Sequence, residues 1–350
     1  MRSSLIQTRS IVVDPERPDP AAIKEAATIL EAGGLVAFPT ETVYGLGADA
    51  TSAGAVGRIF QAKGRPPSNP LIVHVDGADM ARSCLADPNV SPEVARLWDR
   101  WWPGPVTFVL EKSSRIPDVV TAGSRTVGLR MPRSPIALAL IQALGRPIAA
   151  PSANRSTGVS PTRAEHVRKD LDGLVELILD GGPTSIGLES TVVDLTGQIP
   201  RVLRVGPITE SELRTRDEPT PGRSTAIAER PASPGQARVH YAPRTPTYWV
   251  EPADLGRVAL RGRGGLLVVG RRMGSVAWSH DRRIDLEEPV EAARRLYDVL
   301  HDLEDSRLDF LVVVPPPAEP EWETIRDRLW RASRPLEGTG SIEEATLIEE

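Results

Sequence analysis

Apolar residues recur along this chain in short runs that glycine and proline separate. In residues 21–32 they follow helical spacing and stop at Gly33-Gly34, a typical C-terminal helix signal. Residues 53–63 and 134–144 are predicted helices on the same pattern. Short apolar runs rich in β-branched residues predict strands at 35–38, 71–75, 106–110, 126–131, 147–150, 174–180 and 190–195. Interleaved strands and helices indicate an α/β domain that runs to about residue 214.

The pattern changes after this domain. Residues 216–246 are rich in proline and show no apolar periodicity, which is typical of a stiffened linker. Beyond it, apolar runs at 264–270 and 309–317 predict strands, and helical spacing appears near 290–305 and 321–332. The sequence therefore predicts a catalytic domain over 1–215, a linker over 216–246 and a smaller α/β domain with a parallel sheet over 247–350.

Composition excludes several classes of protein. The 350 residues are 40% hydrophobic and 25% charged, and the net charge of -5 argues against a surface coated for nucleic-acid binding. A single cysteine, Cys84, allows neither an internal disulfide nor a zinc site of paired cysteines. The N-terminus has no apolar run of signal-peptide length, and no run is long enough to span a membrane. We therefore expect a cytoplasmic protein without a membrane partner.

Three dense polar clusters lie at the ends of predicted strands, at 38–47, 63–74 and 150–162. In α/β folds, ligands bind at the ends of strands, so these clusters are candidate binding segments. Two arginines outside the clusters, Arg130 and Arg204, also lie on or beside predicted strands.

The chemistry of these clusters favours two anionic ligands. Lys63 and Arg65 follow a predicted helix and can reach over phosphates. Arg130 lies on a strand that we expect to be buried, where a cation is costly unless it meets an anion. Neutral hydrogen-bonding groups are supplied by Asn69, Ser152 and Asn154. A nucleoside triphosphate and a carboxylate fit this set.

Each cluster taken alone is more often structural than functional, and His74 alone is more often a hydrogen-bonded core residue. Other machinery is absent: the sequence has no P-loop motif and no nucleophile elbow around Ser152. The spacing Gly45-x-Gly47-x-x-Ala50 resembles a dinucleotide-binding turn but lacks the acidic residue about twenty positions on. An enzyme that works by positioning and charge is therefore the better interpretation.

Seven segments, in this order, closely resemble the YrdC-like domain of threonylcarbamoyl-AMP synthases. They are PTETVYGLG, KGRPPSNPLIVHV, WPGPVTFVL, VGLRMPRSP, PIAAPSANRSTG, GLESTVVDL and RVLRVG, and together they cover about residues 21–210. The segment SPGQARVHYAP (233–243) and the smaller second domain resemble the long, two-domain form of the family. The resemblance implies a YrdC-like twisted mixed sheet with helices, followed by a smaller Rossmann-like α/β domain.

The resemblance also implies an activity. Members of the family are nucleotidyltransferases that condense L-threonine, bicarbonate and ATP into threonylcarbamoyl-AMP and pyrophosphate. A tRNA threonylcarbamoyl transferase complex then uses the product to make threonylcarbamoyladenosine. Mg²⁺ on ligands that the sequence does not identify, and a weak contact with tRNA, are further expectations.

Carried over motif by motif, the resemblance assigns residues to each substrate. The threonine-binding set is Thr42, His74, Arg130, Ser152 and Ser190. The ATP-binding set is Lys63, Arg65, Asn69, Thr126, Asn154, Thr162, Arg204 and Tyr241, with Lys63 over the phosphates and Tyr241 closing as a lid. Lys63 and Arg65 are the expected catalytic residues, because they would offset the repulsion between an anionic attacker and the α-phosphate.

Two alternatives stay open at this point. A YrdC-like fold without synthase activity could bind structured RNA through a basic concave face, although this would leave the neutral side chains beside the cations unexplained. Related domains also occur in hydrogenase-maturation carbamoyltransferases, but those resemble zinc-finger proteins in their cysteine pairs, and this chain has one cysteine.

Overall fold

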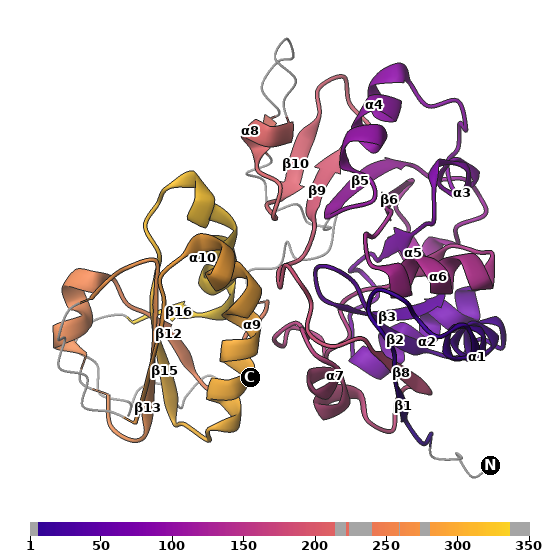
Figure 1. Cartoon of the computed structure of the whole chain (residues 1–350). Helices are drawn as coiled ribbons and strands as arrows, with labels where there is room; N and C mark the ends of the chain where they lie inside the picture. Colours follow the sequence, from indigo (N-terminus) through magenta and orange to yellow (C-terminus); the bar gives the residue numbers. More distant parts are fainter. Residues whose placement is uncertain (1–5, 214–221, 224–239, 259, 274–280, 337–350) are drawn as a thin grey trace. The chain divides into compact units, whose positions relative to one another are not determined.

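A computed structural model of the chain describes residues 6–213, 222–223, 240–258, 260–273 and 281–336. The chain divides into two compact units (Figure 1). The first comprises Met1–Ser156 and Ser160–Ala237, and the second comprises Thr157–Val159 and Arg238–Glu350. The predicted linker, 216–246, lies mostly outside the described residues.

A single mixed sheet of eleven strands forms the centre of the first unit. Parallel pairs such as β4–β6 alternate with antiparallel pairs such as β5–β6, which confirms the predicted mixed α/β class. The sheet order is β1-β8-β2-β3-β7-β4-β6-β5-β9-β10-β11. The bounds are β1 (Arg9–Val12), β2 (Val36–Pro39), β3 (Tyr44–Asp49), β4 (Ile72–His74), β5 (Val106–Glu111), β6 (Thr126–Arg130), β7 (Ile148–Ala149), β8 (Leu177–Asp180), β9 (Thr191–Asp194), β10 (Arg201–Arg204) and β11 (Gly222–Arg223).

Helices cover both faces of this sheet. Along β2, Val36 and Phe38 join the core with helices α1 and α6, whereas Leu35 and Ala37 join the core on the other side, with α2. Helices α1 and α6 pack against each other (Figure 1). The bounds are α1 (Pro20–Glu31), α2 (Ala53–Lys63), α3 (Ala78–Ser83), α4 (Pro92–Trp101), α5 (Asp118–Thr121), α6 (Pro135–Leu144), α7 (Ala164–Leu171) and α8 (Glu210–Leu213). The three predicted helices are confirmed within one residue.

Local chemistry fixes the ends of α2, which presents two candidate site residues. The Ser52 hydroxyl caps the N-terminus by accepting from the Ala55 N–H at 3.3 Å. Gly64 ends the helix in the left-handed conformation at φ 61°. Lys63 is therefore the last residue of the helix, and Arg65 begins the following loop.

Strand β3, which the apolar pattern did not predict, explains the Gly-x-Gly spacing. A Cβ atom at Gly47 would lie 2.7 Å from the Phe38 ring and 3.0 Å from Ile148. Glycine is required there because neighbouring side chains pack directly onto the backbone. The spacing thus serves strand packing, in agreement with our rejection of a dinucleotide-binding turn.

The second unit contains a five-stranded sheet in the order β14-β13-β15-β12-β16. All of its strand pairs are parallel, as predicted for this domain. The bounds are β12 (Thr247–Trp249), β13 (Gly264–Val269), β14 (Arg282–Leu286), β15 (Phe310–Val314) and β16 (Arg334–Pro335), with α9 (Pro289–Asp305), α10 (Glu323–Ala332) and the short helices η1 (Pro252–Arg257) and η2 (Pro320–Trp322). Across the described part of the chain, no helix has the length and apolarity to cross a membrane.

Candidate active site

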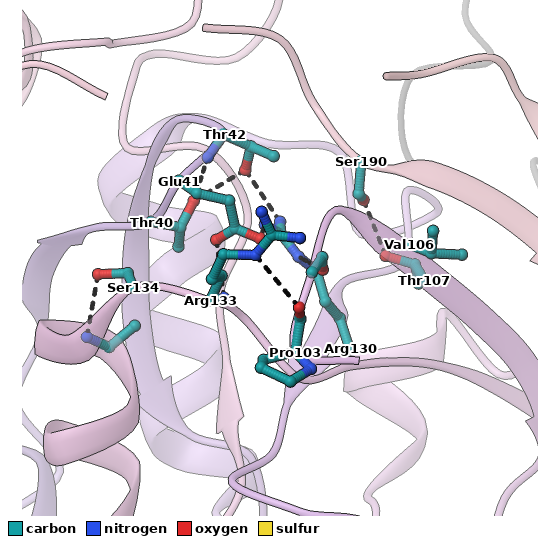
Figure 2. A network of polar contacts seen from close by, with 12 residues as sticks. Thr40, Glu41, Thr42, Pro103, Val106, Thr107, Arg130, Arg133, Ser134 and Ser190 are labelled. Atoms are coloured by element: carbon teal, nitrogen blue, oxygen red, sulfur yellow. Dashed lines mark hydrogen bonds and ion pairs between the residues drawn. The ribbon is translucent and has the colours of Figure 1, made fainter. Parts of the chain in front are cut away.

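Arg130, the last residue of β6, is buried in the first unit with two hydrogen bonds and one ion pair (Figure 2). Its Nη1 donates to the Thr42 hydroxyl at 2.9 Å, and its Nε donates to the Gly104 carbonyl at 3.2 Å. Its Nη2 forms an ion pair with Glu41 Oε1 at 2.8 Å, and the two side chains are 5% and 6% exposed. The buried Arg130 thus has the anionic partner that we expected, but this partner is Glu41 of the protein and not a ligand.

His74 lies beside Arg130, because the two residues are partners in the β4–β6 register. Burial, followed by the charge of Arg130, lowers the pKa of His74 to about 3. The imidazole is therefore neutral near neutral pH. Its buried Nδ1 has no hydrogen-bond partner among the described residues. His74 can thus offer an uncharged donor or acceptor to a ligand at this place.

Lys63 is almost fully buried and bonds to the loop at 152–154. Its ammonium donates to the carbonyl oxygens of Ser152 at 2.6 Å and Asn154 at 2.5 Å, and to Asn154 Oδ1 at 3.4 Å. Burial and, secondarily, the charge of Arg65 lower its pKa, whereas Asp170 opposes them. All three acceptors are neutral oxygens, so the ammonium fixes this loop while its charge remains available to a nearby anion.

Arg65 holds the loop that carries Asn69. Its Nε donates to the Asn69 carbonyl at 3.0 Å, and its Nη2 donates to the Pro70 carbonyl at 2.8 Å. Pro70 also borders a small pocket that is partly open to solvent. Hydroxyl, glycine and apolar residues line the pocket, among them Ile72, Thr107, Thr126, Gly128 and Val192. The predicted residues Asn69 and Thr126 thus lie at or next to one uncharged pocket.

Ser190 and Arg204 are joined by hydrogen bonds next to this pocket. Arg204 donates to the Ser190 carbonyl at 2.9 Å and to its hydroxyl at 3.1 Å. The Ser190 hydroxyl also contacts the hydroxyl of Thr107, a pocket residue, at 2.8 Å (Figure 2). Hydrogen bonds therefore connect Arg204, through Ser190, to Thr107 in the wall of the pocket.

Thr162 is held by α7. Its backbone N–H donates to His166 Nδ1 at 3.3 Å, and the adjacent Ser160 hydroxyl donates to Glu189 Oε1 at 2.6 Å. Glu189 precedes Ser190 directly in the sequence. The segment around Thr162 is thus anchored to the same loop that presents Ser190.

Backbone contacts bring the polar clusters together. Gly45 and Ser152 form an antiparallel bridge, which joins the first cluster to the third. The N–H of Gly187 donates to the Thr42 carbonyl at 3.1 Å, and the N–H of Thr184 donates to the Thr162 carbonyl at 3.0 Å. These contacts therefore join the segments of Thr42, Ser152 and Thr162, although the segments lie far apart in the sequence.

Tyr241 is the one predicted site residue that belongs to the second unit. It is 1% exposed, stacks on Tyr297 at 5.7 Å between ring centroids, and lies under the Arg328 guanidinium at 5.1 Å. Its backbone has a positive φ of 63°. Its role as a lid over the nucleotide stays a prediction.

The sequence analysis did not identify two residues that contact predicted site residues. Glu41 pairs with Arg130, and Thr107 links the pocket to Ser190. Glu41 could have been noticed as an acidic residue between Thr40 and Thr42, directly after a buried strand. Thr107 carried no such signal, because a threonine inside a strand is ordinary.

The acidic and histidine side chains of the described residues do not form a metal cage. No group of three or more His, Cys, Asp or Glu residues in that part of the chain is placed to hold a metal ion.

Comparisons with known proteins agree with the fold and the motifs. The Sua5/YciO/YrdC family model, described as telomere recombination, matches residues 28–206, and the model for the C-terminal domain of threonylcarbamoyl-AMP synthase matches residues 198–334. Among the curated relatives, threonylcarbamoyl-AMP synthase of Bacillus subtilis is 41% identical over 92% of this chain and 96% of its own. The Schizosaccharomyces pombe enzyme of that name is 36% identical over 89% of this chain and 88% of its own.

A solved structure matches both units. The crystal structure of Pyrococcus abyssi Sua5 complexed with L-threonine is similar with a TM-score of 0.82 and 36% identity, covering 93% of this chain and 97% of the other. These relatives do not favour the alternative of an RNA-binding module without synthase activity. The chain belongs to the threonylcarbamoyl-AMP synthase family, in its long two-domain form.

Proposed function

We propose that this protein condenses L-threonine, bicarbonate and ATP into threonylcarbamoyl-AMP and pyrophosphate, as a nucleotidyltransferase. The observation that carries the proposal is the buried group of Arg130, Thr42 and His74 beside an uncharged pocket bordered by Thr126. Relatives of nearly the same length have this activity in their names, and one was solved with L-threonine.

Threonine is proposed to bind with its carboxylate on Arg130. An arginine has five N–H donors, and Arg130 directs three of its nitrogens to Thr42, Gly104 and Glu41, so donors remain for a ligand. The neutral His74 and the hydroxyls of Ser152 and Ser190 are the other proposed contacts. Burial strengthens each of these polar contacts, because water competes less for the donors.

The adenosine of ATP is proposed to occupy the pocket next to Thr126. Its walls carry no charge and offer hydroxyl groups and apolar surface, which suits a neutral aromatic base. Asn69, Asn154 and Thr162 are proposed contacts of the nucleotide, and Tyr241 is proposed to close over it.

The reaction joins two anions, so the site must offset their repulsion. The threonine amine and bicarbonate give a carbamate, whose oxygen attacks the α-phosphate as pyrophosphate departs. Lys63, Arg65 and Arg204 are proposed to supply fixed positive charge at this step. Mg²⁺ would enter on the phosphates of ATP and neutralise part of their charge. A closed site would keep water from the labile carbamate.

The product is an activated group that needs an acceptor. We propose that a tRNA threonylcarbamoyl transferase complex accepts it for modification of tRNA, and that this protein itself contacts tRNA weakly if at all.

Mass spectrometry of the products tests the reaction. Purified protein is incubated with ATP, bicarbonate, Mg²⁺ and each amino acid in turn, and pyrophosphate release is measured in parallel. We expect threonylcarbamoyl-AMP with L-threonine, and pyrophosphate release that depends on both threonine and bicarbonate. AMP formation that is independent of the amino acid would contradict the proposal.

A further inference from the structure

Three buried polar atoms without an aligned hydrogen bond gather at one place in the first unit. They are Glu41 Oε1, His74 Nδ1 and Arg130 Nη2. Glu41 Oε1 and Arg130 Nη2 lie 2.8 Å apart as an ion pair, yet neither completes a well-directed hydrogen bond. Buried polar groups are normally hydrogen-bonded, so this incomplete ion pair, with His74 as the strand partner of Arg130, indicates a place where a polar ligand completes the three groups.

The carboxylate of Glu41 is held in position from its other side. Its Oε2 accepts the Arg133 N–H at 3.1 Å (Figure 2). Its backbone carbonyl accepts the Ile186 N–H at 2.8 Å. A carboxylate can accept about four hydrogen bonds, so Oε1 has capacity beyond the contact with Arg130. The side chain is thus both fixed and unsaturated.

The proposed function places a zwitterion at this group. Threonine brings an α-ammonium as well as a carboxylate, and an ammonium buried without an anionic partner is strongly disfavoured. His74 is neutral and cannot balance it. Glu41 is the carboxylate in direct contact with Arg130, and the two groups together mirror the two charges of an α-amino acid.

We propose that Glu41 binds the α-ammonium of the amino-acid substrate while Arg130 binds its carboxylate. This assignment rests on the proposed function, because it assumes that threonine lies at Arg130. The Glu41–Arg130 pair then selects ligands that carry both charges at α-amino-acid spacing. It disfavours simple hydroxy acids. They have a carboxylate but no ammonium, so the carboxylate of Glu41 would face the carboxylate of the ligand without a cation between them.

Calorimetric binding to the full chain tests this with two ligands, L-threonine and (R)-3-hydroxybutanoate, which is threonine without its amino group. In the wild type, the hydroxy acid is expected to bind at least about tenfold more weakly, because it lacks the charge-assisted hydrogen bond. In Glu41→Gln, threonine affinity is expected to fall at least about tenfold, whereas hydroxybutanoate affinity is unchanged or higher.

Glu176→Gln is the matched control. Glu176, directly before β8, also contacts both an arginine and a backbone N–H. It pairs with Arg58 of α2 at 2.5 Å and accepts from the Leu35 N–H at 2.8 Å, and it is not a predicted site residue. Its variant is expected to keep wild-type affinity for both ligands. Should Glu41→Gln not fold, equal wild-type affinities for the two ligands would still overturn the assignment.

Two results would overturn the assignment. Equal losses for both ligands in Glu41→Gln would mean that Glu41 only orients Arg130, and equal wild-type affinities would mean that the ammonium has no anionic partner. Wild-type protein that does not bind threonine at all would instead refute the proposed function on which the assignment depends.

Discussion

Replacing Lys63 with methionine tests whether this side chain positions the Ser152–Asn154 segment or only supplies positive charge to the phosphates. Methionine keeps an unbranched side chain of similar length but removes the ammonium and its donors. The carbonyl oxygens of Ser152 and Asn154 then lose the donor that lies 2.6 Å and 2.5 Å away, respectively. Because the Ser152–Asn154 segment carries two predicted ligand contacts, we expect the variant to lose both stability and activity.

The structure sets the scale of the stability loss. Each buried carbonyl left without a donor costs about 1–3 kcal/mol, so two cost about 2–6 kcal/mol. Removing a buried ammonium returns part of this, because burial had disfavoured its charged form and lowered its pKa. A net loss of about 2–4 kcal/mol follows, which corresponds to a melting temperature lower by roughly 4–15 °C for a domain of this size.

Calorimetric unfolding and pyrophosphate release measure the two effects in the same preparations. Lys112→Met is the control, since Lys112 donates to the Ile116 carbonyl at 2.8 Å, pairs with the exposed Asp118 at 2.9 Å and is not among the predicted site residues. We expect the control to remain active. A Lys63→Met protein with an unchanged melting temperature and no nucleotide binding would refute the positioning role and assign Lys63 to the phosphates alone.

Three further predictions follow from other parts of the structure. His74 stays neutral in the fold to about pH 3, while an unfolded chain takes up its proton near pH 6.5, so acid destabilises the fold below pH 6.5. At pH 5 the resulting loss in the free energy of unfolding is about 2 kcal/mol. Urea unfolding at pH 7.5 and pH 5 should show this loss in the wild type but not in His74→Gln. Gly128→Ala adds a Cβ 3.1 Å from a pocket threonine, so the KM for ATP should rise several-fold while that for threonine is unchanged. The control Gly57→Ala faces open space on a helix and should stabilise the protein by about 0.5–1 kcal/mol without changing either KM. Deletion of 216–350 should impair pyrophosphate release through loss of Tyr241, and a fully active truncated enzyme would remove any catalytic role for the second unit.

Sequence patterns predicted the elements whose periodicity is strong. Helix α6 was located within one residue and strand β15 within three, because apolar residues dominate both. Strand β3 was missed because its sequence, YGLGAD, has too few β-branched residues, and its glycines respond to packing by Phe38 from the neighbouring strand. Tertiary contact of this kind leaves no trace in local propensity.

The candidate site was predictable in composition but not in its internal contacts. The sequence indicated that Arg130 needs an anion, yet Glu41 is 89 positions away and no local pattern relates the two. The contact of Lys63 with the Ser152–Asn154 segment likewise spans 89 or more positions. The sequence therefore predicted that a buried cation such as Arg130 needs a partner, but only the fold shows which residue that partner is.

The central claim is that the buried Arg130 group and the pocket beside Thr126 bind an amino acid and a nucleotide side by side. A crystal structure of the protein with L-threonine and a non-hydrolysable ATP analogue tests it most directly. We expect the threonine carboxylate within hydrogen-bond distance of Arg130 and the adenine against Thr126 and Val192. Threonine bound elsewhere, with Arg130 still closed on Glu41 and the pocket empty of nucleotide, would contradict the account.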